Sequence, residues 1–542
     1  MSIKQYPGGI VTKNPTAPTT SAAKGIWTLD QAQNYTKQGI WPRSPGAPTI
    51  GTATAGSGSA TVAYTVPTDL GAGAITYTAT SSPGGLTGTG ASPITVSGLT
   101  NGTAYTFTVT ATTPGGTGPA SAASNSITPV APSFMANLYG GLARSVVTDS
   151  SDNILMLGYD TNNQYVNIAK YTNAGVLVYQ KQTSVSGTSG NRIAIDSSGN
   201  MAVGTVGGGQ QRLLVYDSTG ALTWQRYISG WPSGCSGATP QSGAGVCFDP
   251  SGNVYIGTPV YYACLYGYTL SKFNSSGTKQ WSRTFTNNLN SNPYTSLASD
   301  SAGNIYFTTG RVPGSGYYTG TLVKVNSSDG TTIWNRFVDL PCNYPNTYGQ
   351  DVVVDSSDNV YMTGNLGTNS FVAKYNSSGT NQWVKQASFG AQSYSYGVSV
   401  DTSGNVYLTG HYLFDYKMYM IKLNSSGTEQ WQRQMTANTS GWKSYGEDAH
   451  VDSGGNPVFV GTLNNAADNR MFIMKPPSDG SATGTYTLSG LSWTYSASSA
   501  SISTPSVTLG TGGPSNSAIS LSASASSYTV SNGSLTTGTT IL

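Results

Sequence analysis

The chain has 542 residues, of which only 9% are charged, and its 25 basic and 22 acidic side chains leave a net charge of +3. No cluster of lysine or arginine provides the basic face that nucleic acid binding requires, and no apolar run approaches the ~20 residues of a membrane-spanning helix. The 68 glycines, and 35 tyrosines against 12 phenylalanines, favour strands joined by tight turns. The sequence therefore predicts an all-β protein with no nucleic acid partner and no membrane insertion.

Residues 1–45 form a polar arm that contains one predicted helix. Thr28 is placed to cap its start, Gly39 to end it, and Pro42 prevents its continuation. Because so short a helix is marginal in water on its own, we interpret it as a docking element for a partner, with a local staple in a flexible arm as the alternative. The candidate docking residues are Trp27, Leu29, Tyr35 and Trp41.

Residues 46–130 alternate polar and apolar side chains with a period of two, which predicts a small β-sandwich. The segment from Gly98 to Ala111 places a leucine in a turn, then Gly-Thr, then Tyr105 at the start of an alternating strand. This segment resembles the fibronectin type III domain, in which such a tyrosine forms the tyrosine corner. The family's strand B tryptophan is missing, so Val62 or Tyr64 would have to fill its volume.

Residues 131–495 repeat one pattern of strand, Asp-x-x-(Gly or Asp)-Asn turn, strand, loop, strand, turn and strand. The turns begin at Asp149, Asp196, Asp249, Asp300, Asp355, Asp401 and Asp452. Four strands in each repeat of about 50 residues are typical of a β-propeller, so we expect seven blades.

A second pattern places a glycine four residues before an aromatic residue of the last strand. It occurs as Gly220/Trp224, Gly277/Trp281, Gly330/Trp334, Gly379/Trp383 and Gly427/Trp431, with Gly175/Tyr179 in the first repeat. It resembles the tryptophan-docking motif of quinoprotein-type propellers, which implies that each indole packs between neighbouring blades.

The seventh repeat departs from the pattern, and we expect its outer strand at Leu491–Tyr495. Residues 496–542 are rich in Ser, Ala and Thr with weak alternation. They are expected to add an edge strand or return to the base of the propeller, with a flexible tail as an equal alternative.

Two classes of loop are expected, because the turns within strand pairs are short and uniform whereas the other connections are long and aromatic. Variable aromatic loops on a rigid scaffold often bind ligands, and tyrosine and tryptophan suit glycan or protein recognition. A tyrosine-rich chain would show tyrosines in its loops in any case. The candidate ligand-binding face comprises Trp231, Tyr261, Tyr262, Tyr317, Tyr318, Tyr344, Tyr394, Tyr396, Phe414 and Trp442.

Catalytic and metal-binding chemistry is not indicated. The aspartate turns lack the alternating ligands of a calcium loop, and Asp and Asn already bond the backbone in tight turns. The Asn-Ser-Ser-Gly-Thr turns resemble sialidase Asp-boxes only superficially, because the acid is absent. His411 and His450 are the only histidines, and no catalytic triad or carboxylate pair can be nominated. We therefore expect no enzyme, no cofactor and no metal.

The four cysteines, Cys235, Cys247, Cys264 and Cys342, lie in or beside the long loops and lack the spacing of a zinc site. Buried or idle thiols are the expectation, with one optional disulfide, for example between Cys235 and Cys264.

The start of the chain lacks the apolar region of a secretory signal, although the hydroxyl-rich, lysine-poor composition is of an extracellular kind. The order of parts, and the segment from Gly25-Ile26-Trp27 to Trp41-Pro42, resemble fibre and appendage proteins of marine and cyanobacterial tailed bacteriophages. The resemblance implies a virion protein that is assembled in the host cytoplasm and extracellular after lysis. Its arm would dock on other virion proteins, its propeller would adsorb to a host surface glycan or decorate the particle, and a homo-oligomer stays open. The alternatives are a bacterial cell-surface adhesive protein and, third, a glycan-degrading propeller enzyme.

Overall fold

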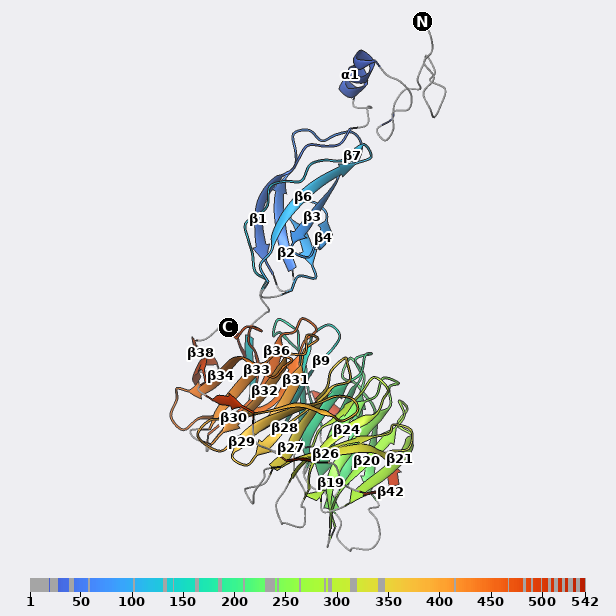
Figure 1. The fold of residues 1–542 in the computed structure, drawn as a ribbon, viewed down its shortest axis with the longest axis vertical. Coiled ribbons are helices and arrows are strands. Elements are labelled where there is room, and N and C mark those ends of the chain that lie inside the picture. Colours follow the sequence, from blue (N-terminus) through green and yellow to red (C-terminus); the bar gives the residue numbers. More distant parts are fainter. Residues whose placement is uncertain are drawn as a thin grey trace. The chain divides into compact units, whose positions relative to one another are not determined.

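The computed structural model describes residues 28–38, 43–129 and 134–541, together with residue 19 (Figure 1). Gaps within these ranges fall at 57–58, 101–102, 140, 161–164, 184–187, 208–209, 230–238, 241–242, 263–264, 287–288, 291–294, 312–318, 340–346, 414–415, 466, 481–483, 489–490, 499, 505–507, 511–514, 519–521, 525–529 and 533–536. The chain divides into two compact units, Met1–Ala131 and Pro132–Leu542.

The predicted helix of the arm is present as α1 (Leu29–Lys37). Thr28 caps it, since its Oγ1 accepts a hydrogen bond from Gln31 N at 3.2 Å and Gln31 Oε1 accepts one from Thr28 N at 3.0 Å. Leu29 is 74% exposed and Tyr35 is half-buried. The helix thus presents an apolar side chain at its first turn. Trp27 and Trp41 lie outside the described residues.

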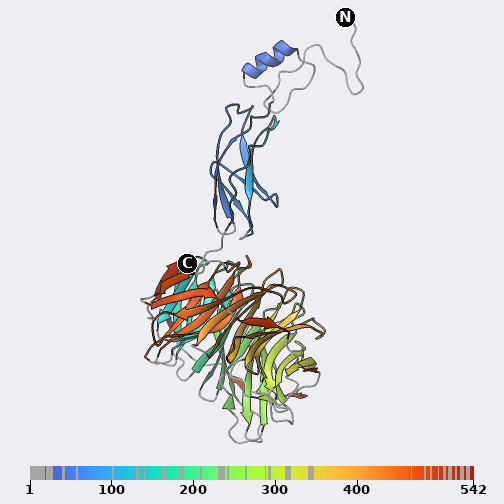
Figure 2. The same ribbon diagram turned by 60° about the vertical axis from the view of Figure 1, so that its left-hand side comes forward.

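The rest of the first unit is a β-sandwich of two antiparallel sheets, whose layers are clearest in Figure 2. One sheet contains β1 (Thr49–Ala55), β2 (Ser59–Thr65) and β5 (Ile94–Ser97); the other contains β4 (Thr87–Thr89), β3 (Thr76–Ser82), β6 (Thr106–Thr113) and β7 (Gly116–Thr117). Alternate residues of β6 are buried, as the period-two pattern predicts. Val62 and Tyr64 both lie in the core, and Tyr105 OH accepts a hydrogen bond from Thr100 N at 3.1 Å.

The second unit has a propeller-type fold, in which the described residues form seven antiparallel sheets, here numbered 1 to 7 in chain order. Sheets 1 and 2 contain β9 (Leu142–Thr148), β10 (Ile154–Tyr159), β11 (Val166–Tyr171) and β12 (Leu177–Thr183), then β13 (Thr188–Ile195), β14 (Met201–Gly207), β15 (Gln210–Tyr216) and β16 (Leu222–Ser229). Sheet 3 contains β17 (Thr239–Pro240), β18 (Gly245–Phe248), β19 (Val254–Tyr262), β20 (Leu265–Phe273) and β21 (Lys279–Thr286). Sheet 4 contains β22 (Leu289–Asn290), β23 (Leu297–Ser299), β24 (Ile305–Arg311), β25 (Thr319–Val325) and β26 (Thr332–Asp339).

Sheet 5 contains β27 (Thr347–Val354), β28 (Val360–Leu366), β29 (Asn369–Tyr375) and β30 (Asn381–Ser388). Sheet 6 contains β31 (Ser393–Val400), β32 (Val406–Tyr412), β33 (Lys417–Leu423) and β34 (Glu429–Ala437). Sheet 7 contains β35 (Lys443–Val451), β36 (Pro457–Asn464), β37 (Asn469–Lys475) and β8 (Phe134–Tyr139). The inner strands contact one another in the cyclic order β9, β13, β18, β23, β27, β31, β35 and back to β9, so the first and last sheets meet.

The expected outer strand of the seventh repeat is wrong. The segment Leu491–Tyr495 lies in β39 (Leu491–Ala497), which pairs with β34 of sheet 6 and with β38 (Gly484–Leu488). The outer position of sheet 7 is taken by β8, which precedes the first repeat and pairs with β37. Sheet 7 therefore joins strands from both ends of the unit, an arrangement that counting repeats forward along the chain cannot reveal.

Beyond β39, which pairs with sheet 6, the chain adds one antiparallel strand to the outer edge of each of the other six sheets in turn. These strands are β40 (Ser501–Ser503) on sheet 5, β41 (Thr508–Gly510) on sheet 4, β42 (Ser515–Ala518) on sheet 3, β43 (Ser522–Ser524) on sheet 2, β44 (Val530–Asn532) on sheet 1 and β45 (Thr537–Ile541) on β8 of sheet 7. We call β39 to β45 the C-terminal belt. Three alternatives were expected for residues 496–542, and the structure shows edge strands. These edge strands recur on sheet after sheet around the unit.

Neighbouring sheets are fastened by the predicted tryptophans. Trp281 Nε1 donates to Ser327 O in the next sheet at 3.1 Å, and the other four tryptophans of the set donate in the same way. The indole of Trp281 packs against the backbone of Gly330. The φ of Gly330 is +73°, and a Cβ at this position would lie 2.8 Å from the indole ring. The pattern therefore reflects inter-sheet packing, as the resemblance implied.

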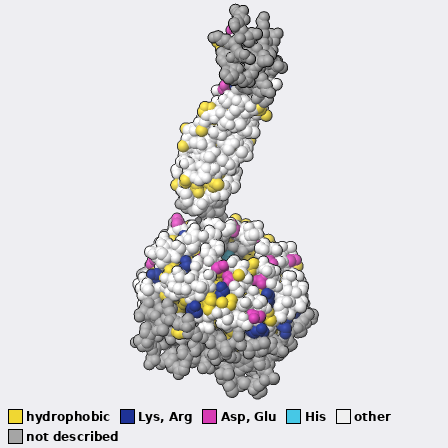
Figure 3. Space-filling model, turned by 45° about the vertical axis from the view of Figure 1, so that its right-hand side comes forward, with side chains coloured by type: hydrophobic (Ala, Val, Ile, Leu, Met, Phe, Trp, Pro, Cys, Tyr) yellow, Lys and Arg dark blue, Asp and Glu magenta, His cyan; other side chains and the backbone are white. Residues whose placement is uncertain are grey.

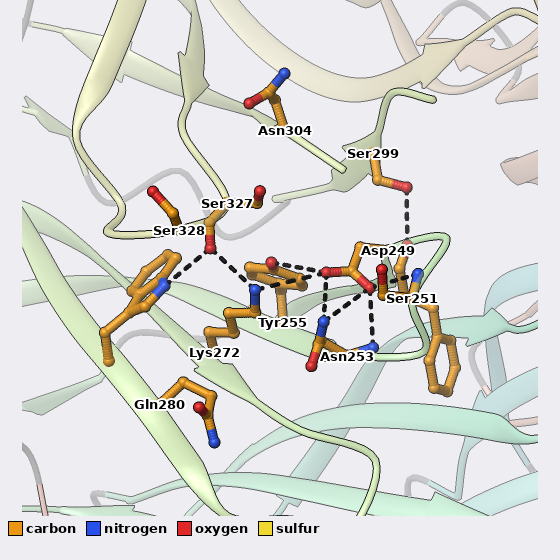
Figure 4. Close-up of polar contacts among 12 residues, drawn as sticks. Asp249, Ser251, Asn253, Tyr255, Lys272, Gln280, Ser299, Asn304, Ser327 and Ser328 are labelled. Carbon is orange, nitrogen blue, oxygen red and sulfur yellow. Dashed lines mark hydrogen bonds and ion pairs between the residues drawn. The ribbon is translucent and has the colours of Figure 1, made fainter. Parts of the chain in front are cut away.

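The aspartate turns are held by the bonds expected of tight turns. Asp249 Oδ1 accepts from Ser251 N at 3.0 Å and from Asn253 N at 2.9 Å, and Tyr255 OH donates to Asp249 Oδ2 at 3.0 Å (Figure 4). Lys272 Nζ lies 3.7 Å from the same carboxylate and donates to Ser327 O at 3.0 Å, so it links the turn to the next sheet. These aspartates are structural.

Candidate functional site

Five of the seven inner strands contain a β-bulge at the same place. The extra residue is Arg144 in β9, Asn191 in β13, Gln350 in β27, Tyr396 in β31 and Glu447 in β35. A bulge re-aims the side chain of its extra residue, and bulges are frequent beside functional sites. Three of the five residues, Arg144, Tyr396 and Glu447, line one pocket, so the fold itself directs these side chains to a common place.

This pocket, which we call the bulge pocket, has a volume of about 280 Å³ and lies where sheets 6, 7 and 1 meet. Its lining residues are Leu142, Arg144, Tyr396, His411, Tyr445, Glu447, Thr462 and Asn464. They lie near the starts of the inner strands and the ends of the second strands, where the long connections leave the sheets. We call this side of the unit the loop face.

Aromatic rings gather at the bulge pocket. The His411 ring lies 5.4 Å from Tyr396 and 4.7 Å from Tyr445, and Tyr394 lies 5.5 Å from the same imidazole. Tyr416 extends the group, with its ring 5.8 Å from Tyr445. Rings at these separations hold one another in place, so the pocket wall is rigid and amphipathic.

The two charged side chains that line the bulge pocket have opposite signs and form an ion pair. Arg144 Nη1 lies 3.3 Å from Glu447 Oε2, and their side chains are 19% and 11% exposed. Burial raises the pKa of the Glu447 carboxyl, although Arg144 and Arg192 oppose that shift. Burial lowers the pKa of His411 to about 4, so its imidazole is neutral near pH 7. The lining thus combines one cation, one anion and one neutral imidazole.

One arginine lies behind the bulge pocket, along the axis of the inner strands. Arg192 of sheet 2 donates to Tyr396 O of sheet 6 at 3.1 Å, and its guanidinium lies 3.1 Å from Asp448 of sheet 7 and 3.5 Å from Asp351 of sheet 5. Asp448 also accepts from Ser145 Oγ at 2.8 Å. The Arg192 guanidinium therefore links its own sheet 2 to sheets 5, 6 and 7. These ionic groups also line a second cavity of about 230 Å³ among the inner strands.

The predicted ligand-binding residues are brought together only in part. Tyr394 and Tyr396 lie together, with ring centroids 6.0 Å apart, and Tyr396 lines the bulge pocket. Trp442 instead packs edge-on against Trp493 at 6.3 Å, outside the pocket lining. Trp231, Tyr317, Tyr318, Tyr344 and Phe414, and the side chains of Tyr261 and Tyr262, lie outside the described residues.

Arg144 and Glu447 were not predicted as site residues from the sequence, and His411 was given no role; Tyr445 belongs to the aromatic residues expected on the long-loop face but not to the ten candidates. A signal for the bulge residues is present: Arg144, Tyr396 and Glu447 each stand five residues before the aspartate that begins the turn of their repeat, Asp149, Asp401 and Asp452. Aligning the repeats on that aspartate would have placed all three in one column. The bulge that turns this column toward the pocket has no sequence mark of its own.

Other observations concern a buried cysteine, metal ligands, membrane-spanning helices and surface charge. Cys247 lies buried in β18 as a free thiol rather than in a loop, and burial raises the pKa of that thiol. Within the described ranges no group of three or more His, Cys, Asp or Glu side chains could hold a metal ion, and no helix has the length and apolar character needed to cross a bilayer. On the face drawn in Figure 3, acidic and basic side chains of the second unit are interspersed rather than gathered.

Comparisons with known proteins found one family model and several solved structures that are similar to parts of this chain. Residues 267–475 match a repeat family described as outer membrane protein assembly factor BamB. Among solved structures, the Dos1 propeller is 10% identical, with 79% of this chain and 95% of that chain covered and a TM-score of 0.38. The quinohemoprotein alcohol dehydrogenase of Comamonas testosteroni is 10% identical (64% and 76% covered, TM-score 0.33), and rhamnogalacturonan lyase YesW is 13% identical (79% and 90% covered, TM-score 0.31). The search of curated protein sequences gave no match.

Proposed function

We propose that this chain is a non-enzymatic recognition protein that binds a surface glycan in the bulge pocket of its propeller. The observation that carries the proposal is the convergence of three bulge residues, Arg144, Tyr396 and Glu447, on one pocket walled by aromatic rings. Sugar rings pack their apolar faces on aromatic side chains while their hydroxyls bond polar groups. The tyrosines and the Arg144–Glu447 pair offer both kinds of contact side by side.

The pocket chemistry favours binding over glycan cleavage. Glycosidases use two carboxyl groups that flank the scissile bond about 5–9.5 Å apart. Glu447 is the one carboxylate among the lining residues, and it is paired with Arg144. His411 is neutral and stacked among tyrosine rings, which suits hydrogen bonding to a ligand. A glycan-degrading enzyme is therefore the weaker candidate, and turnover of any glycan that binds would establish it.

We propose, as finer features of the fold, a seven-bladed propeller and a fibronectin type III-like sandwich. Seven sheets whose inner strands contact in cyclic order support the first. The bond from Thr100 N to Tyr105 OH, which is that of a tyrosine corner, supports the second. Trp is absent from the sandwich core, where Val62 and Tyr64 are packed.

We place this recognition protein in a virion appendage, attached through residues 1–45. The resemblance of the N-terminal segment to phage appendage proteins supports this placement, as does a capped helix that exposes Leu29. Mass spectrometry of purified phage particles should detect the chain, and a Leu29→Asp variant should incorporate less well. If the gene lies outside any phage locus and the chain is found on bacterial cells, the cell-surface adhesive alternative replaces the virion one.

The glycan proposal is tested with the full-length chain on an array of neutral surface glycans, followed by calorimetry. Tyr445→Ala should weaken binding about 10- to 100-fold, as for a central aromatic contact. Tyr165→Ala is the matched control, because Tyr165 is a half-buried tyrosine between β10 and β11 on the loop face and does not line the bulge pocket. Equal affinities of the two variants would contradict the proposed site.

A further inference from the structure

The bulge pocket has a closed inner end. Behind Tyr396, the guanidinium of Arg192 bonds the backbone oxygen of that residue and the two carboxylates Asp351 and Asp448. The three ionic side chains are at most 8% exposed. Asp351 also accepts a hydrogen bond from Val398 N, and Asp448 accepts one from Val146 N. These bonds fix the ionic cluster around Arg192 to the strands on either side of it. The Arg192 cluster therefore occupies the axial side of the bulge pocket, and we take the loop face as the side from which a ligand would reach it.

The size of the bulge pocket limits what it can enclose. Its volume of about 280 Å³ lies just below the ~300–1,000 Å³ that is usual for drug-sized ligands. It is walled on three sides by strands of sheets 6, 7 and 1. A pocket of this size that is closed by the Arg192 cluster at one end suits one ring-sized group, whereas a groove that holds an internal chain segment must be open at both ends.

The polar lining indicates a neutral ligand with adjacent donors and acceptors. A charged group would compete for one member of the Arg144–Glu447 pair and leave the other uncompensated in a largely buried place. His411 Nδ1 is buried and meets no hydrogen-bond partner among the described residues, although the imidazole lines the bulge pocket. Because unpartnered buried polar atoms are costly, this atom indicates a bonding position that a ligand hydroxyl, or water in its place, would fill.

We infer that the bulge pocket holds a single neutral sugar ring at the free end of a glycan chain, rather than a segment within the chain. This inference rests on the proposed glycan-binding function and adds the mode of binding. The ring would stack on the tyrosine wall, with vicinal hydroxyls bonded to the Arg144–Glu447 pair and one hydroxyl reaching His411. The remainder of the glycan would point away from the loop face into solvent.

The test uses the full-length chain and measures affinity by calorimetry. For each neutral glycan that binds on the array, the probes are the methyl glycoside of its terminal sugar and the same glycan after an exoglycosidase has removed that sugar. Linear maltoheptaose and cyclic β-cyclodextrin serve as a further pair, because they share their linkage and only the first has a free end. Glu447→Gln reports on the polar contact, with Tyr165→Ala as the control and thermal unfolding as the check on folding.

The inference predicts that the methyl glycoside binds within about tenfold of the whole glycan, and that trimming weakens binding by about 100-fold or more. Glu447→Gln should weaken the methyl glycoside and the whole glycan by the same factor. Affinity that survives trimming, or grows steadily with chain length, would overturn the end-on mode while leaving glycan recognition intact. An array on which no glycan binds would overturn the proposed function and this inference together.

Discussion

Arg192→Met should destabilise the second unit strongly, because this guanidinium of sheet 2 is the common partner of groups from three other sheets. It lies 3.1 Å from Asp448 and 3.5 Å from Asp351, and it donates to Tyr396 O at 3.1 Å. Methionine approximates the length of the aliphatic stem, so the change removes charge and hydrogen bonds with little loss of packing. Two buried carboxylates are then left without a cation.

Removing one partner of a buried ion pair costs about 3–5 kcal/mol, and we expect a loss of this size near pH 8. Burial raises the pKa of Asp448, an effect that Arg192 opposes and the like charge of Asp351 reinforces, so the variant should raise it further. A carboxyl whose folded pKa is raised contributes stability at low pH that is lost as the pH rises through that pKa. The deficit of the variant should therefore shrink as the pH falls toward 5.

Urea unfolding followed by tryptophan fluorescence at pH 8 and pH 5 measures both expectations. Arg470→Met is the control: Arg470 is 13% exposed, but its partner Asp468 is 32% exposed and stays hydrated when the cation is lost, so we expect a smaller loss. A deficit for Arg192→Met no larger than that of the control, or one that is unchanged at pH 5, would refute the role assigned to this guanidinium.

Three further predictions concern the architecture. Trp281→Ala should cost about 3–5 kcal/mol, because it empties an inter-sheet contact and removes one of the two donors to Ser327 O, leaving Lys272 Nζ; a Tm unchanged in calorimetry would count against this docking role. Asp152→Gly keeps a backbone φ of +61° that glycine tolerates and removes two bonds to Ser453, so it should cost about 1–2 kcal/mol in urea unfolding; wild-type stability would show that these bonds do not help join sheets 7 and 1. Truncation after Ala497 should speed amide hydrogen exchange in the outer strands β12, β16, β21, β26 and β30, and unchanged protection there would argue against the C-terminal belt.

Local chemistry explains what could be predicted about the fold. The aspartate turns and docking tryptophans each depend on a few neighbouring residues, so Asp249 and Trp281 have the roles that their patterns indicate. The capping of α1 by Thr28 is of the same local kind. The turns and the tryptophans also recur at regular spacing, and this repetition makes the four-stranded unit recognisable from the sequence alone.

Long-range pairing explains what could not be predicted. Strand β8 joins β37 across more than 300 residues, and the belt strands β40 to β45 are short, mostly Ser- and Thr-rich segments with little pattern of their own. In the bulge pocket, Tyr396 was predicted from its aromatic loop, whereas Arg144 and Glu447 come from sheets at opposite ends of the repeat order. Arg144 and Glu447 come together only because the first and last sheets are in contact, and no single repeat specifies that contact.

Whether the bulge pocket binds glycan is tested most directly by the affinity of Tyr445→Ala and Tyr165→Ala for a glycan that the wild-type chain binds. We expect Tyr445→Ala to weaken binding about 10- to 100-fold and Tyr165→Ala to retain wild-type affinity, with both variants folded by thermal unfolding. Wild-type affinity in Tyr445→Ala, or equal losses in the two variants, would contradict this expectation.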